Sequence, residues 1–403
     1  MVLAGPNSQL YHIVILLLGS IFDICAGFDN AMGAITLLYI FLSAAIIQLG
    51  FYLLVFSRLV LYRNDKKNLK EVSQPVSVII CARNEEVNLK NNLSAVLEQD
   101  YHDFEVVVVN DASEDNSAEI LAKLQLKHPH LNIIEITSAD KLGEGKKHAL
   151  EKAIRAAKHN IVLLTDADCK PVSNNWIKMM ARNFDTEEVQ IVLGYSPYLH
   201  QSTFLNFLIR FDVFYTALQY FSFTLSKMPY MGVGRNLAYT KELFFKNNGF
   251  ENHLEFICGD DDLFVNETAN VKNTRVALSK DSFVASQPKE TFKELIIQKR
   301  RHWGAGRYYR NDHLMVLGIL FLSQFFFYYS FLLLLFSEIN LNIILLVFGL
   351  RFLIQLIVFK KVAQKLNETT VFWLFSPLMD FLYLGFGILM NLSNLFIPKS
   401  KWQ

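Results

Sequence analysis

The stretch Val162-Leu163-Leu164-Thr165-Asp166-Ala167-Asp168-Cys169 decides the fold, because a short apolar run ends in two carboxylates that are one residue apart. In an extended strand, residues i and i+2 point the same way, so Asp166 and Asp168 can face one ligand. Open α/β sheets bind ligands at the carboxyl ends of their strands. Two carboxylates there suit a hard divalent cation that also takes diphosphate oxygens. A polar turn after a buried strand is the commoner explanation of an isolated Asp-x-Asp, so other stretches must decide.

Composition narrows the class of protein. With 403 residues, the chain can hold one large domain or two ordinary ones. The net charge of +1, without a basic tract interleaved with aromatic residues, gives no reason to expect nucleic acid as a partner. Hydrophobic residues make up 52% of the chain, with 34 Phe among them, and this apolar excess is concentrated at the two ends. The four Cys show no CxxC spacing, so a disulfide scaffold or a thiolate zinc site is not indicated and the middle of the chain should face a reducing cytosol.

Strands alternate with helices in the middle of the chain. Strands are predicted at residues 76–80, 104–109, 131–136 and 161–165, and helices follow to about residue 97, at 117–127 and to about residue 158. The run from Phe104 is too apolar for a solvated strand and is predicted to be central and parallel. The alternation indicates βαβ units, hence an α/β fold with a mostly parallel sheet and helices on both faces. The first crossover has neither GxGxxG nor GxxxxGK[ST], which disfavours a dinucleotide oxidoreductase or a P-loop NTPase.

The N-terminal part is predicted to cross a membrane. Residues 32–56 carry no charge and are long enough for a span, and Arg58, Arg63 and three lysines follow within 14 residues. This asymmetry places the chain after the span in the cytoplasm. The apolar run at 13–21 is short for a span and is a poor signal peptide. Because Met32 stands directly before the span, either Met1 or Met32 can be the natural start.

Three apolar stretches follow the soluble region, at about 314–336, 339–359 and 371–396. The lysines at 360, 361 and 365 place the loop between the second and third inside, and this parity sends the C-terminus outside, where Lys399 and Lys401 fit poorly. A re-entrant or interfacial helix is therefore the alternative to a third span. Arg351 and Asp380 interrupt these stretches and are expected to face protein or water. The predicted domains are a membrane anchor (1–61), a cytosolic domain (62–312) and C-terminal transmembrane helices (313–403).

Further polar stretches have both functional and structural explanations. The sequence Gly259-Asp260-Asp261-Asp262-Leu263 is predicted to follow an apolar strand, and its three carboxylates suit a functional site or a solvated helix start. Lys146 can reach a phosphate or simply begin a helix. The cations around Gln298–Gly306 can serve a site or bind anionic lipid. Residues 200–230 read as an amphipathic helix on the membrane face or as part of the core.

Together, these stretches resemble a membrane-anchored family 2 glycosyltransferase of GT-A fold, the kind that includes cellulose, hyaluronan and poly-N-acetylglucosamine synthases and ceramide glucosyltransferase. The resemblance covers roughly residues 74–310. It rests on Ala82-Arg83-Asn84-Glu85-Glu86, on Asp111, on Lys146 in a Gly-Lys-x-x-Ala-Leu pattern, on Asp166-x-Asp168, on Asp260 in a Glu-Asp-x-Asp-Leu pattern, and on Gln298 and Arg301 in a Gln-x-x-Arg-Trp pattern. Three positions depart from the family: Arg83 replaces an aromatic residue, Gly259 replaces Glu, and His302 takes the Trp place with Trp303 one residue late.

The resemblance implies roles for individual residues. Mg²⁺ or Mn²⁺ would be bound by Asp168 and Asp166. Catalysis would involve Asp260 as general base, with Arg301 and Gln298. Substrates would be bound by Ala82, Arg83, Glu85, Asp111, Lys146, Asp166, Asp262, His302 and Trp303.

The predicted activity is transfer of a hexose-type sugar from a nucleotide-sugar donor to a lipid-linked or glycan acceptor. Charge develops on the leaving diphosphate, which a metal and Arg301 or Lys146 can neutralise. The acceptor hydroxyl needs a base, and with no enzyme nucleophile the transfer should invert the anomeric centre. Few polar residues interrupt the spans, which favours a non-processive enzyme. The predicted location is a bacterial inner (plasma) membrane. A processive polysaccharide synthase and a non-catalytic membrane scaffold remain alternatives, whereas a transporter would need more polar residues among its spans.

Overall fold

The computed structural model describes residues 31–63, 74–137, 139, 145–254, 256, 258–368 and 371–396. The apolar run predicted at 13–21 lies outside these residues. Packing divides the described chain into two units, one of residues 31–51 with 318–355 and one of residues 52–317 with 356–396. The domain boundaries after residues 61 and 312 follow hydropathy rather than packing and stay a prediction.

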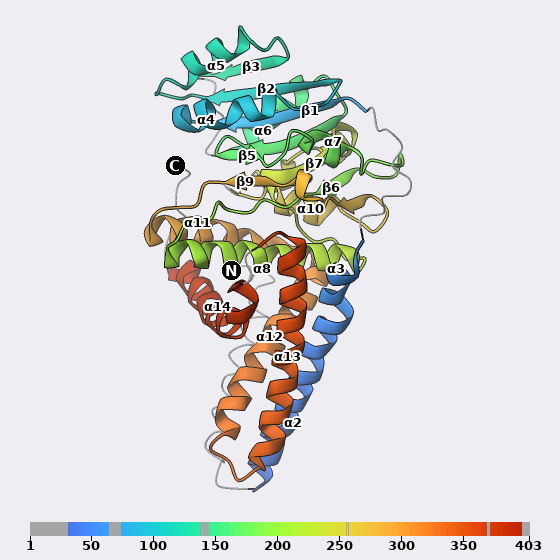
Figure 1. Cartoon of the computed structure of the whole chain (residues 1–403), viewed down its shortest axis with the longest axis vertical. Coiled ribbons are helices and arrows are strands. Elements are labelled where there is room, and N and C mark those ends of the chain that lie inside the picture. The colour runs from blue at the N-terminus through green and yellow to red at the C-terminus, as the bar shows by residue number, and fades with distance from the viewer. Residues whose placement is uncertain are drawn as a thin grey trace, which may run out of the picture. The chain divides into compact units, whose positions relative to one another are not determined.

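The larger unit is built on a seven-stranded sheet with the order β3-β2-β1-β4-β7-β6-β8 (Figure 1). Its strands are β1 (Val76–Ala82), β2 (Phe104–Asp111), β3 (Leu131–Ile136), β4 (Ile161–Asp166), β6 (Ile191–Leu193), β7 (Leu237–Thr240) and β8 (Thr274–Val276). The first four are parallel, whereas β7 is antiparallel to both β4 and β6. The predicted α/β fold, its four strands and the central place of β2 are confirmed.

Helices cover this sheet because its strands are apolar on both faces. Val78 of β1 and Val106 of β2 pack in one cluster with Leu89 and Leu93 of α4 (Glu86–Leu97). Ile79, which alternation turns to the opposite face, is also buried, and α6 (Lys147–Ala156) contacts β1 and β2. Each such buried side chain contributes about 1.5–3 kcal/mol. Four further helices belong to this part of the chain: α5 (Ser117–Gln125), α7 (Trp176–Ala181), α9 (Lys241–Lys246) and α10 (Asp262–Thr268).

Strand register brings the polar strand ends to one edge. Cys81 of β1 is paired with Asp166 of β4, and the next residue, Ala82, is paired with Asn110 of β2. The chain runs outward from β1 to β2 and β3 in one direction and returns to β4 on the other side, so the strand order reverses between β1 and β4. Ligands of open α/β sheets bind at such a reversal. Strand β5 (Cys169–Pro171) follows Asp168 directly in the chain. It pairs with β9 (Val284–Ser286) in a separate two-stranded antiparallel sheet.

The aromatic stretch at 200–230 forms α8 (Phe204–Leu225), which is buried along most of its length. Its acids and bases are paired inside the unit. Asp212 forms an ion pair with Lys299 of α11 (Phe292–Ala305) and accepts from the Tyr383 hydroxyl of α14 (Val371–Phe396) at 3.0 Å. Arg210 donates to Glu368 at 2.6 Å. The prediction of a core helix therefore describes α8 better than that of a helix lying free on a surface.

The smaller unit contains α2 (Ala31–Gly50) and parts of α12 (Asn311–Leu334) and α13 (Leu341–Lys365). Arg351 of α13 is fully buried and donates to Gln48 of α2 at 3.0 Å, and Gln48 donates to Ser323 of α12 at 2.8 Å. Asp380, in the larger unit, is buried as well, so both ionisable residues in these apolar helices face protein, as expected.

Four helical segments of the described residues are long and apolar enough to cross a membrane: Met32–Leu61, Asn311–Leu334, Leu341–Lys365 and Phe372–Met390. The first of them continues from α2 through a π-helix (Phe51–Phe56) and α3 (Ser57–Leu61). These segments match the predicted apolar stretches and indicate a multi-pass membrane protein.

Candidate active site

The pair Asp166 and Asp168 stands at the end of β4, as the sequence predicts. Asp166 forms an ion pair with Lys146, which caps the start of α6. Asp168 accepts from the Ser286 hydroxyl of β9 at 3.2 Å and from the Cys169 thiol at 3.2 Å. Asp166 is therefore the last residue of β4, and Asp168 lies in the two-residue turn between β4 and β5, where hydrogen bonds hold its carboxylate.

The donor atoms at this strand end fit a hard divalent cation. Ligand atoms of Asp166, Asp168 and Cys169 lie within 4.8 Å of one another. Burial, followed by the charges of Asp168 and Asp166, raises the pKa of the Cys169 thiol well above its usual range, so the thiol stays protonated and donates to Asp168. Only carboxylate oxygens remain as ligands, and Mg²⁺ or Mn²⁺ prefers oxygen donors together with waters and phosphates. Asp166 and Asp168 thus form a site of Asp-x-Asp type.

Lys146 connects this pair with the second acidic cluster. Burial lowers the pKa of Lys146, but Asp166 and then Asp260 outweigh burial, so that the net pKa lies well above the usual value. The Cys81 thiol, on the neighbouring strand β1, has its pKa raised to about 12, mainly by burial and in smaller part by Asp260, Asp166 and Asp111. The structure therefore brings four residues predicted from separate motifs into one electrostatic neighbourhood.

The turn before Asp260 requires glycine. Gly259 has a φ of +97°, and a Cβ there would lie 2.4 Å from the Leu263 side chain. The Glu that the family pattern has at this position cannot be accommodated without moving α10. The expectation of an apolar strand before Asp260 is wrong, because Phe256 and Cys258 lie in bends and a 3-10 helix (Glu251–His253) precedes them. Local glycine geometry, rather than a strand end, sets the position of Asp260.

The two carboxylates after Asp260 are used inside the protein. Asp261 accepts from the backbone N–H of Gly234 and of Asp262, both at 2.7 Å. Asp262 accepts from the Tyr309 hydroxyl at 2.9 Å and from the N–H of Leu263 at 2.8 Å. Burial, and next the charge of the preceding Asp, raise the pKa of Asp261 to about 6 and that of Asp262 to about 8.

Asp260 differs from its two neighbours. All three side chains are half-buried, but Asp260 makes no hydrogen bond within the described part of the chain. Its role as general base stays a prediction. Asp262, predicted to bind substrate, accepts a hydrogen bond from Tyr309, and its role toward a substrate stays a prediction.

The nucleotide-binding loop predicted after β1 is joined to the loop after β2. Asn84 has a φ of +57°, and its side-chain oxygen accepts from the N–H of Glu114 at 2.8 Å. The N–H of Glu85 donates to the Ser117 hydroxyl at 3.1 Å. Burial raises the pKa of Glu85, as do Asp168 and Asp166, while a hydrogen bond from Asn88 opposes them.

The other predicted nucleotide ligands lie at the same sheet edge. Ala82 and Asp111 are buried, and Arg83 is half-buried. Ala82 is the last residue of β1, Arg83 comes directly after it, and Asp111 is the last residue of β2, the strand that is paired with β1.

Sequence reasoning did not assign a role to Arg235 or Tyr198. The Arg235 guanidinium lies 4.4 Å from the centroid of the Tyr198 ring, and the Tyr198 hydroxyl accepts from the Gln298 side chain at 3.1 Å. Arg235 lies in the loop Met231-Gly232-Val233-Gly234-Arg235, whose two glycines are the sequence signal that could have drawn attention to it. Gln298 is therefore connected to the site through Tyr198. The side chains of Arg301, His302 and Trp303 lie outside the described residues, so their roles stay predictions.

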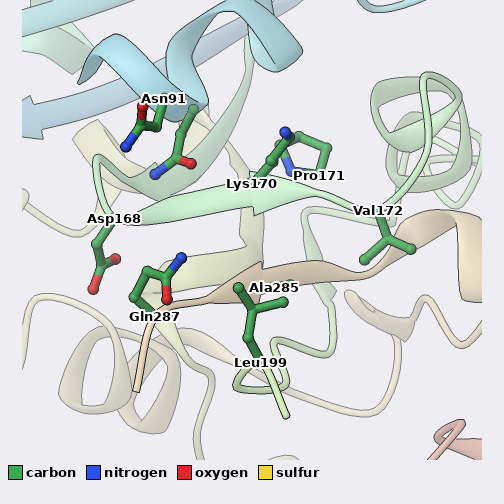
Figure 2. Close-up of a pocket in the computed structure, with 9 residues that line it drawn as sticks. Asn91, Asp168, Lys170, Pro171, Val172, Leu199, Ala285 and Gln287 are labelled. Atoms are coloured by element: carbon green, nitrogen blue, oxygen red, sulfur yellow. The ribbon is translucent and has the colours of Figure 1, made fainter. Parts of the chain in front are cut away.

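A pocket of about 510 Å³ adjoins the Asp-x-Asp turn. Figure 2 shows Asp168 and Gln287 at one end of this pocket and Val172 at the other. Asn92, which also lines it, donates to the carbonyl oxygen of Ala167 at 3.1 Å. The pocket therefore opens directly beside one of the proposed metal ligands.

Comparisons with known proteins agree with this geometry. The family described as glycosyltransferase like family 2 matches residues 74–305, more than half of the chain. The chain is 28% identical over 113 residues to a poly-beta-1,6-N-acetyl-D-glucosamine synthase of Staphylococcus epidermidis, covering 28% of this chain and 25% of that protein. It is 32% identical over 108 residues to the probable glycosyltransferase YdaM of Bacillus subtilis (strain 168), covering 26% and 25%. These alignments span about a quarter of the relatives' length.

Among solved structures, the chain resembles a mannosyltransferase from Pyrobaculum calidifontis in complex with GDP-Man and Mn²⁺. The TM-score is 0.59 at 20% identity, and the alignment covers 89% of this chain and 99% of that one. At this identity the likeness shows the fold, which is of GT-A type. The fold and the strand-end carboxylates agree with the family match. The chain belongs to glycosyltransferase family 2.

Proposed function

We propose that this enzyme moves a hexose-type sugar from a nucleotide sugar to a lipid-linked or glycan acceptor, with inversion at the anomeric carbon and without building a long polymer. The observation that supports the proposal most is the placement of Lys146. It pairs with Asp166 and is also within electrostatic reach of Asp260. A donor site and a carboxylate left without hydrogen bonds among the described residues are thereby adjacent.

In the donor half of the site, Asp166 and Asp168 would hold Mg²⁺ or Mn²⁺, which when bound supplies positive charge to the diphosphate leaving group. Lys146 adds a fixed positive charge that needs no proton transfer. The loop from Ala82 to Glu85 and the buried Asp111 would hold the nucleoside, as in the family that the chain resembles.

In the acceptor half, Asp260 would take the proton of the attacking hydroxyl while the oxygen of that hydroxyl bonds to the anomeric carbon. The electron pair of the broken bond leaves with the diphosphate. Because a single displacement needs no enzyme nucleophile, the product has the opposite anomeric configuration. Gln298 and Arg301 of α11 would border the same space, with His302 and Trp303 next to them in the chain.

Addition of one or a few sugars is supported by the interior of the smaller unit. Its polar residues Gln48, Ser323 and Arg351 bond to one another rather than facing a path for sugar. Phe41 stacks on Phe327 with ring centroids 5.2 Å apart in the same unit. A chain-exporting enzyme needs polar groups that remain free to line a channel.

The basic residues that follow the first span support a cytosolic catalytic domain, and the acceptor would then be used at the cytosolic leaflet. The bacterial sources of the relatives fit a bacterial plasma membrane as the location.

The test is to incubate membranes that contain the protein with a panel of radiolabelled nucleotide sugars and to size the product. We expect a small, organic-extractable glycolipid or a short glycan. A high-molecular-weight polymer that glycosidases degrade would show a processive synthase instead. A binding-competent protein that transfers no sugar from any donor would favour the non-catalytic scaffold.

A further inference from the structure

We propose that Arg235 is a further anion-binding residue of the donor site, where its guanidinium contacts the diphosphate of the nucleotide sugar. The inference rests on the proposed function, since it assigns an additional contact to the same donor.

The strand register places Arg235 beside the Asp-x-Asp pair. In the antiparallel pair of β4 and β7, Leu164 stands opposite Leu237. The pairing ends there, and the 3-10 segment Gly234–Asn236, which carries Arg235 directly before β7, contacts β4. The Thr165 hydroxyl donates to the carbonyl oxygen of Arg235 at 3.0 Å, which fixes the backbone there.

The electrostatics of Arg235 agree with this position. Burial lowers its pKa, but Tyr198, Cys169, Asp168 and Asp166 together outweigh burial and raise the pKa. The guanidinium is therefore charged and feels both carboxylates of the Asp-x-Asp pair.

The Arg235 guanidinium is positioned by an aromatic ring, but one of its nitrogen donors has no acceptor among the described residues. It lies over the Tyr198 ring at 4.4 Å, and the hydrogen bond from Gln298 to the Tyr198 hydroxyl fixes that ring in turn. The Nη1 atom of Arg235 is buried and has no hydrogen-bond partner within the described residues. A buried charged donor without an acceptor is costly, and a phosphate oxygen would satisfy it with a charge-assisted bond. Arginine presents its donors in a planar fork that suits phosphate.

The charges of the site explain why an anion can bind favourably next to two carboxylates. A divalent cation would balance the charges of Asp166 and Asp168. Lys146 and Arg235 would then remain as two positive charges, one next to the pair from α6 and one from the turn before β7. The diphosphate of a nucleotide sugar carries two negative charges. The donor would thus balance these two cations, and unbalanced buried charge is costly.

The experiment compares nucleotide affinities of the full-length protein in detergent with Mn²⁺ present, by isothermal titration with UDP, UMP, GDP and GMP. We expect Arg235→Gln to weaken binding of the better diphosphate by about tenfold to a hundredfold, as for a lost charged hydrogen bond. Binding of the matching monophosphate should change much less. Arg235→Lys should recover part of the loss, because it restores the charge but not the fork.

Arg155→Gln is the matched control. Arg155 lies over the Phe245 ring at 5.2 Å and pairs with Glu151 on the surface of α6, so it is also an arginine on an aromatic ring. Its loss should leave all nucleotide affinities unchanged. Thermal unfolding of each variant identifies a variant that does not fold, in which case Arg235→Lys carries the comparison.

Two results would overturn the inference in different ways. If the wild type binds diphosphates but Arg235→Gln binds them equally well, or loses diphosphate and monophosphate by the same factor, Arg235 is structural and the proposed function is untouched. If the wild type binds none of UDP, GDP, ADP, CDP and dTDP at millimolar concentration, the proposed function itself fails and the inference with it.

Discussion

The backbone N–H of Gly234 donates to the carboxylate of Asp261 at 2.7 Å. The next residue, Arg235, accepts from Thr165, which immediately precedes the Asp-x-Asp pair. A short 3-10 segment (Gly234–Asn236) therefore ties the acidic cluster before α10 to the end of β4. The segments that carry the proposed base and the proposed metal ligands are thus connected by two hydrogen bonds, each between a side chain and the backbone of this 3-10 segment.

The buried pair Asp261 and Asp262 predicts a pH-dependent stability. The pKa of Asp262 is about 8 in the folded protein, above its usual 3.8, so the folded state holds a proton that the unfolded state loses. The stabilisation by Asp262 is complete below pH 3.8 and disappears as pH rises to about 8, with a slope of at most about 1.4 kcal/mol per pH unit. We expect Asp262→Asn, which can still accept from Tyr309, to remove this decline. The measurement is the difference in melting temperature between wild type and variant from pH 5 to 9. A difference that is constant with pH would contradict the assignment.

Gly259 predicts a cost for restoring the family's side chain. Gly259→Ala should destabilise the protein by about 1–3 kcal/mol, because its φ of +97° and the contact with Leu263 both oppose a Cβ. Gly304→Ala is the control, since nothing lies within 4 Å of a Cβ there and helical Ala is favoured over Gly by about 0.5–1 kcal/mol. Chemical denaturation of both variants measures the two effects. Equal stabilities would show that the turn relaxes.

Local pattern predicted most of the sheet, because β1, β2 and β4 are apolar runs that end in polar residues. It could not predict β6 or β8, which are three-residue strands defined by pairing rather than by composition. It also placed Asp260 after a strand, since the apolar residues there suggested one, whereas a positive φ at Gly259 makes a turn.

Tertiary contacts decided the part of the site that the sequence missed. Arg235 and Tyr198 are 37 residues apart in the chain, and only the antiparallel insertion of β7 beside β4 brings the Arg235 turn to the Asp-x-Asp pair. Similarly, Asp262 looks like a ligand in the sequence but is enclosed by Tyr309 from the segment before α12.

The metal assignment predicts a loss of Mn²⁺ binding in Asp168→Asn. The amide oxygen can keep the hydrogen bond from the Cys169 thiol and the amide NH2 can donate to the Ser286 hydroxyl oxygen, so the fold should be kept, but the amide is a poor ligand for a hard cation. We expect the apparent affinity for Mn²⁺ to fall by about tenfold to a hundredfold. It is measured from the electron paramagnetic resonance signal of Mn²⁺ with nucleotide present. Asp185→Asn, an exposed carboxylate, is the control. Wild-type Mn²⁺ affinity in Asp168→Asn, or full transfer activity in excess EDTA, would remove the metal from the site.

The assignment of Asp260 as base predicts that Asp260→Asn separates chemistry from donor binding. Asn keeps the size of the side chain but cannot take the proton of the acceptor, so turnover should fall by about 10²–10⁴. Donor affinity should change little, because Asp166 and Asp168 remain and Lys146 keeps its partner Asp166. Steady-state transfer and nucleotide titration on the same preparation measure both quantities, with the exposed Asp281→Asn as control. A variant that transfers at the wild-type rate but has lost nucleotide affinity would reverse the roles of the two acidic clusters. Since Asp261 and Asp262 are already hydrogen-bonded inside the fold, neither is expected to replace Asp260, and raising the pH should not restore turnover.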